Sequence, residues 1–259
     1  MPSEPTKKYL RLLTYLSGFF LTINIAFPSY FNAQFLGQFL KDDQIGIIYA
    51  VSSLLTILFI IYTPKLIRKI GLLKTISFIT FLDLLVTLPI AFIANRTAIL
   101  ILFIIYYSLG FVVRYALDTY LEKISDDRNT GDIRGIFLTF TNIAFLISPF
   151  LAGSLINDQG FPIIFIISAI TLLPVIYLAL FQLKEQPSHR LVKNHRVFLA
   201  LKKLWSNKSV ATQNIRNILC VDFLLNFFYS IMVVYTALYL ERHLGLTKEN
   251  IGIIFTAML

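Results

Sequence analysis

The sequence predicts an all-α polytopic membrane protein, and its composition, its long apolar runs and the placement of its basic residues all indicate this class. Of the 259 residues, 57% are hydrophobic and 14% are charged. Soluble domains are about half apolar and about one quarter charged. Apolar runs of roughly 20 residues with almost no charge recur along the chain, and a helix of that length crosses a bilayer. The lipid bilayer is therefore the expected partner of most of the surface.

Apolar windows indicate seven complete membrane spans and the beginning of an eighth. The seven spans are expected near residues 9–31, 44–64, 72–94, 97–120, 135–156, 161–182 and 216–240. The eighth begins near residue 249 and reaches Leu259 after about half the length that a crossing needs. The first apolar run is too long for the core of a signal peptide, so we expect it to be retained.

The basic residues indicate the orientation of these spans. With the N-terminus inside, eighteen of the 23 Lys and Arg residues fall in inner segments, four fall in outer segments, and Arg114 lies within a span. This asymmetry predicts a multi-pass protein of the cytoplasmic (inner or plasma) membrane with a cytoplasmic N-terminus. The net charge of +9 is accounted for by these topology signals, so no nucleic-acid partner is expected.

A long polar segment divides the chain into three parts. We expect a six-helix transmembrane bundle over residues 1–182, a basic cytoplasmic loop over 183–215, and an incomplete second bundle over 216–259. The segment from Phe198 to Trp205 has the apolar spacing of a short amphipathic helix. The loop histidines His189 and His195 lack acidic partners at ligand spacing, so neither a metal site nor a cofactor is expected.

A short repeat indicates a duplicated architecture. The segment Leu40–Ala50 recurs as Leu246–Thr256, at a constant offset of 206 residues, and both copies share an Ile-Gly-Ile-Ile run followed by an aromatic residue. A period of this length holds six spans, which predicts two halves in parallel orientation. A complete second half needs more chain than is present, so the sequence looks truncated. A second copy or a separately encoded C-terminal half is the expected partner.

Two motifs resemble those of the major facilitator superfamily (MFS) of secondary transporters. After the second span such proteins carry a Gly-x-x-x-Asp-Arg-x-Gly-x-Lys-Lys-like loop, and this chain keeps Gly71 and the basic character but has Pro64 and Arg68 at the first Gly and the Asp. The resemblance implies an inner gate in which Arg68 meets Asp118 or Glu122, with the charges exchanged.

The fifth span is similar to the Gly-Pro-x-x-Gly-Gly element of antiporters in the same superfamily. Pro149 and Gly153 match this element, while Ser148 and Ala152 replace glycines. Small and helix-bending residues allow close helix packing and a local kink, and ordinary packing is the alternative interpretation. The resemblance implies secondary active transport of a small solute by alternating access, with proton-coupled export as the finer expectation.

Polar residues within spans mark candidate cavity positions, because they are costly in lipid. Tyr107, Arg114 and Asp118 share one face of the fourth span, where Arg114 could instead simply neutralise Asp118. The other candidates lie in the first and seventh spans, which line the central cavity of the resembled architecture together with the fourth. They are Asn24, Asp222, Asn226 and Tyr229.

Asp83 lies deep in the third span, with no basic residue within one turn. Burial favours the neutral form of a carboxyl group, so we expect Asp83 to be protonated at neutral pH unless it finds a partner. Asp83 and Asp222 are the candidate proton carriers. A neutral structural hydrogen bond is the alternative for Asp83, since the resembled fold places third helices at its periphery.

Two other function classes are disfavoured. A membrane-embedded lipid-modifying enzyme needs polar catalytic groups gathered at one membrane surface, and His189, His195 and His243 do not converge in the sequence. A seven-helix receptor does not fit the inferred inside N-terminus. No phosphate-binding loop of the Gly-x-x-x-x-Gly-Lys-Ser/Thr type occurs. The sequence does not name the solute.

Overall fold

The computed structural model describes residues 4–125, 129–184, 204–206 and 209–258. The regular secondary structure of these residues is helical. Seven of the helices are long and apolar enough to cross a membrane. Each of the seven predicted spans has its helix, so the all-α polytopic fold class is confirmed. The long helices are α1 (Glu4–Ser29), α3 (Asp42–Ile70), α4 (Leu72–Ile90), α5 (Arg96–Ile124), α6 (Thr130–Gln159), α7 (Pro162–Tyr177) and α9 (Val210–Ile231).

Shorter elements complete the chain. Helix α2 (Asn32–Leu36) follows α1, and the expected eighth span is α11 (Lys248–Met258). Two π-helical turns extend longer helices: η1 (Leu178–Gln182) continues α7, and η2 (Met232–Thr236) joins α9 to α10 (Ala237–Arg242). Most of the expected amphipathic helix, residues 198–203, lies outside the described residues.

Glycines make the tight turns that bring successive helices side by side. Gly71 between α3 and α4, Gly160 between α6 and α7, and Gly245 between α10 and α11 have φ values of 92°, 79° and 64°. A side chain is strained at such φ values, whereas glycine adopts them freely. The turn at Gly71 therefore depends on the glycine that the family loop retains.

Many hydroxyl side chains inside the bundle donate to carbonyls of their own helices. Thr14, Ser17 and Thr22 donate to the carbonyls four residues earlier at 2.8, 2.9 and 2.7 Å. This local bonding lets buried hydroxyls sit in an apolar core without a partner on another helix. The polar residues that remain for interhelical or solute contacts are therefore mainly amides, tyrosines and ionisable groups.

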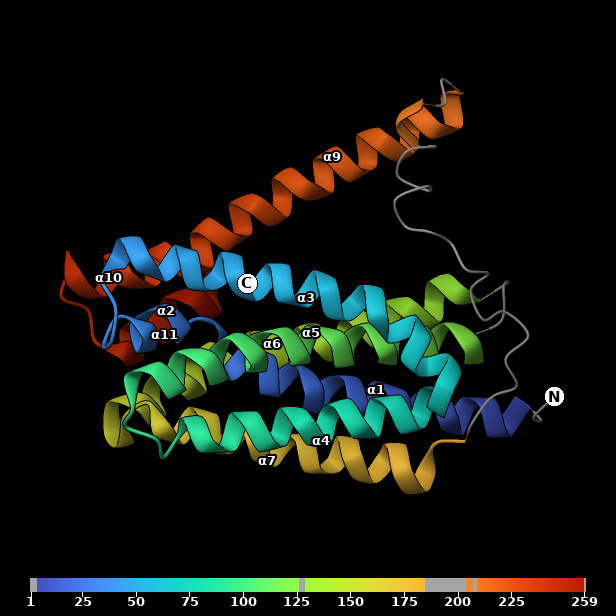
Figure 1. The fold of residues 1–259 in the computed structure, drawn as a ribbon, viewed down its shortest axis with the longest axis horizontal. Coiled ribbons are helices and arrows are strands. Elements are labelled where there is room, and N and C mark those ends of the chain that lie inside the picture. The colour runs from blue at the N-terminus through green and yellow to red at the C-terminus, as the bar shows by residue number, and fades with distance from the viewer. Residues whose placement is uncertain (1–3, 126–128, 185–203, 207–208, 259) are drawn as a thin grey trace.

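The helices from α1 to α7 pack into one bundle with two distinguishable ends (Figure 1). Helix α1 packs on α5, α6 and α7, while α5 also packs on α3 and α4. We call the end of the bundle at which α1 begins the basic end. The opposite end, where α2 lies, is called the α2 end. The basic end carries Lys7, Lys69, Lys123, Lys184 and Arg216.

Helix α11 docks on α6 at the α2 end through two glycines. A Cβ atom added to Gly153 of α6 would collide with the carbonyl of Lys248, and one added to Gly252 of α11 would collide with the carbonyl of Pro149. The repeat counterpart of Gly252 is Gly46 of α3, where an added Cβ would lie 2.8 Å from the Tyr235 hydroxyl. Both copies of the repeated glycine therefore allow close contact with a distant part of the chain.

Helix α9 makes little contact with the bundle. Thr212 is its only buried residue among those described, and large apolar side chains such as Phe223 and Phe228 are exposed by 68% and 63%. Figure 1 shows α9 diverging from α3 toward the basic end. Its continuation through η2 and α10 returns to the bundle and contacts α2 and α11. The space between α9 and the bundle therefore widens toward the basic end.

Replacing Gly153 by alanine should destabilise the protein, because the methyl group collides with backbone atoms that cannot move alone. Overpacking of this kind costs about 1–3 kcal/mol. Gly135→Ala on the same helix is the control, since no atom lies within 4 Å of its added Cβ. We expect the thermal unfolding midpoint in detergent micelles to fall for Gly153→Ala and not for Gly135→Ala. Equal midpoints would show that the α6–α11 contact does not limit stability.

Candidate functional site

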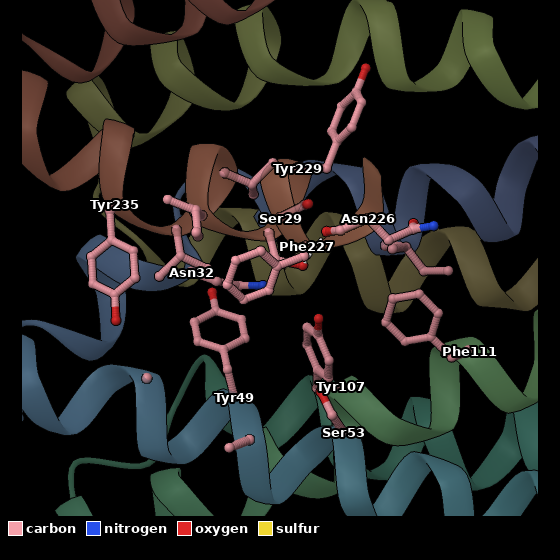
Figure 2. A pocket seen from close by; sticks show the side chains of 18 of the residues that line it. Ser29, Asn32, Tyr49, Ser53, Tyr107, Phe111, Asn226, Phe227, Tyr229 and Tyr235 are labelled. Carbon is pink, nitrogen blue, oxygen red and sulfur yellow. Dashed lines mark hydrogen bonds between the residues drawn. The ribbon is translucent and has the colours of Figure 1, made fainter. Parts of the chain in front are cut away.

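A cavity of about 640 Å³ lies between the bundle and the segment formed by α9 and η2. This volume falls within the range of small-molecule sites in proteins. Figure 2 shows side chains from both parts of the chain facing the same space. Its polar lining residues are Ser29, Asn32, Tyr49, Ser53, Tyr106, Tyr107, Asn226, Tyr229, Ser230 and Tyr235.

The cavity is covered at the α2 end by packed side chains. Gln34 Nε2 donates to the carbonyl of Ala237 at 3.2 Å, which joins α2 to α10. The rings of Tyr30 and Phe255 lie 4.7 Å apart between their centroids, which joins the turn after α1 to α11. Gln34 and Phe255 are buried, so these contacts exclude water from this end.

Two ion pairs also lie at the α2 end. Arg242 at the end of α10 pairs with Asp42 at the start of α3, and Lys248 at the start of α11 pairs with Glu241. The first pair joins the segment after α9 to the bundle. Its side chains are 41% and 49% exposed, so it is screened by solvent and contributes up to about 1 kcal/mol.

Aromatic rings form the wall of the cavity on the α3 and α5 side. Tyr49 and Tyr107 meet edge to face with centroids 5.4 Å apart, and Tyr107 packs on Phe111 at 5.2 Å. Such contacts orient the rings as well as burying them. The wall is therefore mainly apolar and consists of rings inclined to one another, with hydroxyl groups at its edge.

Two buried oxygen atoms in the lining have no hydrogen-bond partner among the described residues: Asn32 Oδ1 and Tyr49 Oη. Buried polar groups are usually paired. Figure 2 shows the Tyr49 hydroxyl pointing toward the Asn32 side chain across the cavity. The lining therefore offers hydrogen-bonding capacity that the protein itself leaves unused.

The comparison with known families agrees with this architecture. The sequence profile described as Major Facilitator Superfamily matches residues 11–259. The chain belongs to the major facilitator superfamily. This membership confirms the resemblance drawn from the motifs and makes the protein a membrane transporter of the major facilitator type. No individually curated protein matches the chain significantly.

The cavity of this MFS protein brings together three of the predicted site residues. Tyr107 comes from α5, while Asn226 and Tyr229 come from α9. Asn24 is buried but does not line the cavity, because its amide turns toward α7 and donates to the Ser168 carbonyl at 3.1 Å. Asp222 lies one turn from Asn226 toward the basic end and accepts a hydrogen bond from the Asn226 amide at 3.1 Å.

Asp118 forms an ion pair with a neighbouring helix. Asp118 pairs with Arg134 of α6 at 3.4 Å, and both side chains are about half exposed. Arg114 is half-buried, and no ion pair joins it to a carboxylate within the part of the chain that the structure describes. Arg134 on the neighbouring helix is thus the ion-pair partner of Asp118 in this conformation, and the neutralisation of Asp118 by Arg114 stays a prediction.

Asp83 is completely buried in α4 and does not line the cavity. Thr87 donates to its Oδ1 at 3.1 Å, and Oδ2 has no partner among the described residues. This hydrogen bond within α4 is the kind that a purely structural role of Asp83 requires. An ionised carboxylate would be poorly satisfied here.

The predicted gating residues fall in two places. Arg68 and Glu122 are exposed at the basic end, and no ion pair joins Arg68 to Asp118 or Glu122 within residues 4–125. Pro149 and Gly153 lie at the α2 end, where both contact α11. No group of three or more His, Cys, Asp or Glu side chains among the described residues is placed to hold a metal ion.

Sequence reasoning missed Asn32, Tyr49 and Tyr235. Asn32 belongs to the five-residue helix α2, which hydropathy windows cannot separate from the end of the first span. A signal for Tyr49 was present, since it is the aromatic residue that ends the repeated Ile-Gly-Ile-Ile run. Its tyrosine hydroxyl was outweighed by the apolar residues around it.

Proposed function

We propose that the protein is a secondary active transporter that moves a small solute across the membrane by alternating access. The observation that carries the proposal is the cavity between the bundle and the α9–η2 segment, covered at the α2 end and flanked at the basic end by a diverging helix. A site between two parts of a transporter that can rock against each other reaches one side of the membrane at a time.

The basic end is the cytoplasmic side in this proposal, and the membrane is the cytoplasmic membrane. The support is the positive-inside asymmetry, because the basic residues gather at the end where α1 begins. The described conformation then corresponds to a transporter whose outer side is closed. The proposed direction of transport is export. Pro149 and Gly153 of the antiporter-like element, at the α6–α11 contact, support it.

Cysteine labelling from outside intact cells should distinguish the two ends. Cys220 is exposed and must first be replaced by serine. In that background, we expect a membrane-impermeant maleimide to modify Asp158→Cys at the end of α6 and to leave Lys69→Cys at the end of α3 unmodified. Both sites are exposed in the fold, so accessibility within the protein does not separate them. The reverse labelling pattern would invert the proposed orientation.

The proposal assigns the chain to two units that move relative to each other. These units are the six-helix bundle of residues 1–182 and a second bundle that begins with residues 216–259, joined by the loop 183–215. The repeat between Leu40–Ala50 and Leu246–Thr256 supports a second bundle related to the first. The exposed face of α9 also supports it, since polar groups such as Asn226 and Asp222 are unfavourable against lipid. Further chain or a second copy would supply its other helices.

Alternating access can be tested without knowing the solute. Ser53→Cys, in the Cys220→Ser background, places a thiol in the cavity lining. We expect it to react from the cytoplasmic side, and reaction from outside to increase about two- to fivefold when Asp42→Arg removes the ion pair with Arg242. Asp43→Arg is the matched control, because it changes the adjacent exposed acid. The exchange Asp42→Arg with Arg242→Asp should restore the original reactivity.

Equal outside reactivity in Asp42→Arg and Asp43→Arg would argue against closure by the Asp42–Arg242 pair. Reaction from one side alone in every variant, with Asp42→Arg included, would contradict alternating access itself.

Closing the basic end should bring Arg114 and Asp222 together. Figure 2 shows Phe111 and Asn226 at the same end of the cavity. Arg114 is three residues beyond Phe111 on α5, and Asp222 is four residues before Asn226 on α9, so both lie about 5 Å nearer the basic end at a rise of about 1.5 Å per residue. Their opposite charges are complementary across the open space, and pairing would be strengthened by exclusion of water.

Cross-linking should capture this closed arrangement. We expect a short bifunctional thiol reagent to join Arg114→Cys to Asp222→Cys in the Cys220→Ser background. The control pair is Arg114→Cys with Leu224→Cys, which has a similar depth but lies on another face of α9. Mass spectrometry of the digested protein measures the yield of each pair. Equal yields would show that α9 does not close with its Asp222 face toward α5.

Proton coupling is the finer part of the proposal. Asp222 is reachable from the basic end, and its protonation would remove the charge that attracts Arg114, whereas Asp83 is buried beside Thr87. The test is the uptake of the transported solute into vesicles under an imposed pH gradient. Comparing Asp222→Asn with Asp83→Asn decides which carboxyl group carries the proton. A carrier that both substitutions leave fully gradient-driven does not use either of them.

A further inference from the structure

Among the described residues, the lining of the cavity carries no formal charge, although charged residues stand just beyond it. The twenty described lining residues are apolar, aromatic, hydroxyl, amide or glycine. The nearest charged residues on the two flanking helices, Arg114 and Asp222, lie outside the lining toward the basic end. An ion transferred from water to such a place without a counter-ion pays a large desolvation penalty. The cavity therefore disfavours solutes with a net charge.

The aromatic wall favours an apolar body that carries aromatic rings. Tyr49, Tyr107 and Phe111 form a continuous series of ring contacts on one side, and Phe227 faces them from α9. Rings held in this way bury apolar surface and stack on an aromatic ligand with little loss of side-chain entropy. A volume of about 640 Å³ accommodates a solute of one or two fused rings with a polar substituent.

The unpaired polar atoms specify what the solute must offer. The oxygen of a side-chain amide only accepts hydrogen bonds, so Asn32 Oδ1 needs an N–H or O–H donor. Asn32 is 2% exposed, so bulk water reaches it poorly. The Tyr49 hydroxyl points toward the Asn32 side chain from α3 and can donate to an acceptor on the same substituent.

From these observations we infer that the cavity takes an uncharged aromatic solute bearing a hydroxyl or amide group, which donates to Asn32 and accepts from Tyr49. The inference rests on the proposed function, because it treats the cavity as the transport site. It adds the chemical class of the solute, which neither the family nor the motifs supply.

Three probes with one aromatic body test this inference: 2-(2-naphthyl)ethanol, 2-(2-naphthyl)ethylammonium and 2-naphthylacetate. Their binding to the purified chain in lipid nanodiscs is measured by equilibrium dialysis. We expect the alcohol to bind at least about tenfold more tightly than either ion, because the lining offers no counter-charge. Tightest binding by the ammonium ion, which the tyrosine rings could attract, would overturn the inference, as would tightest binding by the carboxylate or no binding at all.

Substitutions locate the binding in the cavity. Tyr49→Phe keeps the ring and removes the hydroxyl, so it should weaken binding of the alcohol about three- to tenfold, the worth of one neutral hydrogen bond. Tyr62→Phe is the matched control on the same helix, since Tyr62 is 58% exposed and outside the lining. Equal affinities in the two variants would overturn the assignment of Tyr49.

Asn32→Asp gives a second, gain-of-function test. A carboxylate at this position supplies the counter-charge that the cavity lacks, so the preference should shift from the alcohol toward the ammonium ion. An unchanged order of the three probes would place their binding elsewhere and overturn the inference. If the order of the probes does not change, the proposed function still stands as long as the reaction of Ser53→Cys from outside increases when Asp42→Arg is introduced. That measurement uses no solute, so the two failures can be told apart.

Discussion

The contact between α6 and α11 is the interaction on which the arrangement of the two parts of the chain depends. Gly153 and Gly252 each leave room for a carbonyl of the opposite helix, so the two backbones approach directly. In lipid there is little hydrophobic gain from bringing helices together, and close van der Waals packing between small residues takes its place. The position of η2, and with it one wall of the cavity, follows because α10 and α11 are fixed to the bundle while α9 is not.

The transition from α9 to η2 explains how a single segment both lines the cavity and diverges from the bundle. The π-helical turn Met232–Thr236 widens the helix next to the cavity, and it contributes Val233, Val234 and Tyr235 to the lining. Turns of this kind interrupt the regular hydrogen-bond ladder and occur often at functional sites. Beyond it toward the basic end, α9 is a regular helix with exposed side chains on most of its surface.

Much of the fold could be predicted from the sequence, because spans in a bilayer obey a strong physical constraint on length and polarity. Hydropathy located every long helix, whereas the five-residue α2 and the two π-helical turns leave no comparable signal. The site was less predictable. Helical spacing selected Tyr107, Asn226 and Tyr229, which line the cavity. Asn24 and Asp118 have partners on neighbouring helices that spacing along one helix cannot reveal. Asn32 and Tyr49 became visible only when α2 and α3 were placed opposite η2.

The two repeated glycines give the closed end of the cavity an asymmetry. One edge of this end is the α6–α11 contact, where Gly252 faces a backbone carbonyl that moves only if the whole of α6 moves. The other edge is the contact of α3 with η2 and α10. There Gly46 faces the hydroxyl of Tyr235, which a rotation of one side chain withdraws, and the Asp42–Arg242 contact is open to solvent. Separation of the two edges therefore has unequal barriers. In the proposed transport cycle, the α6–α11 edge would therefore be the axis of rotation, and the solute would leave the cavity along α3.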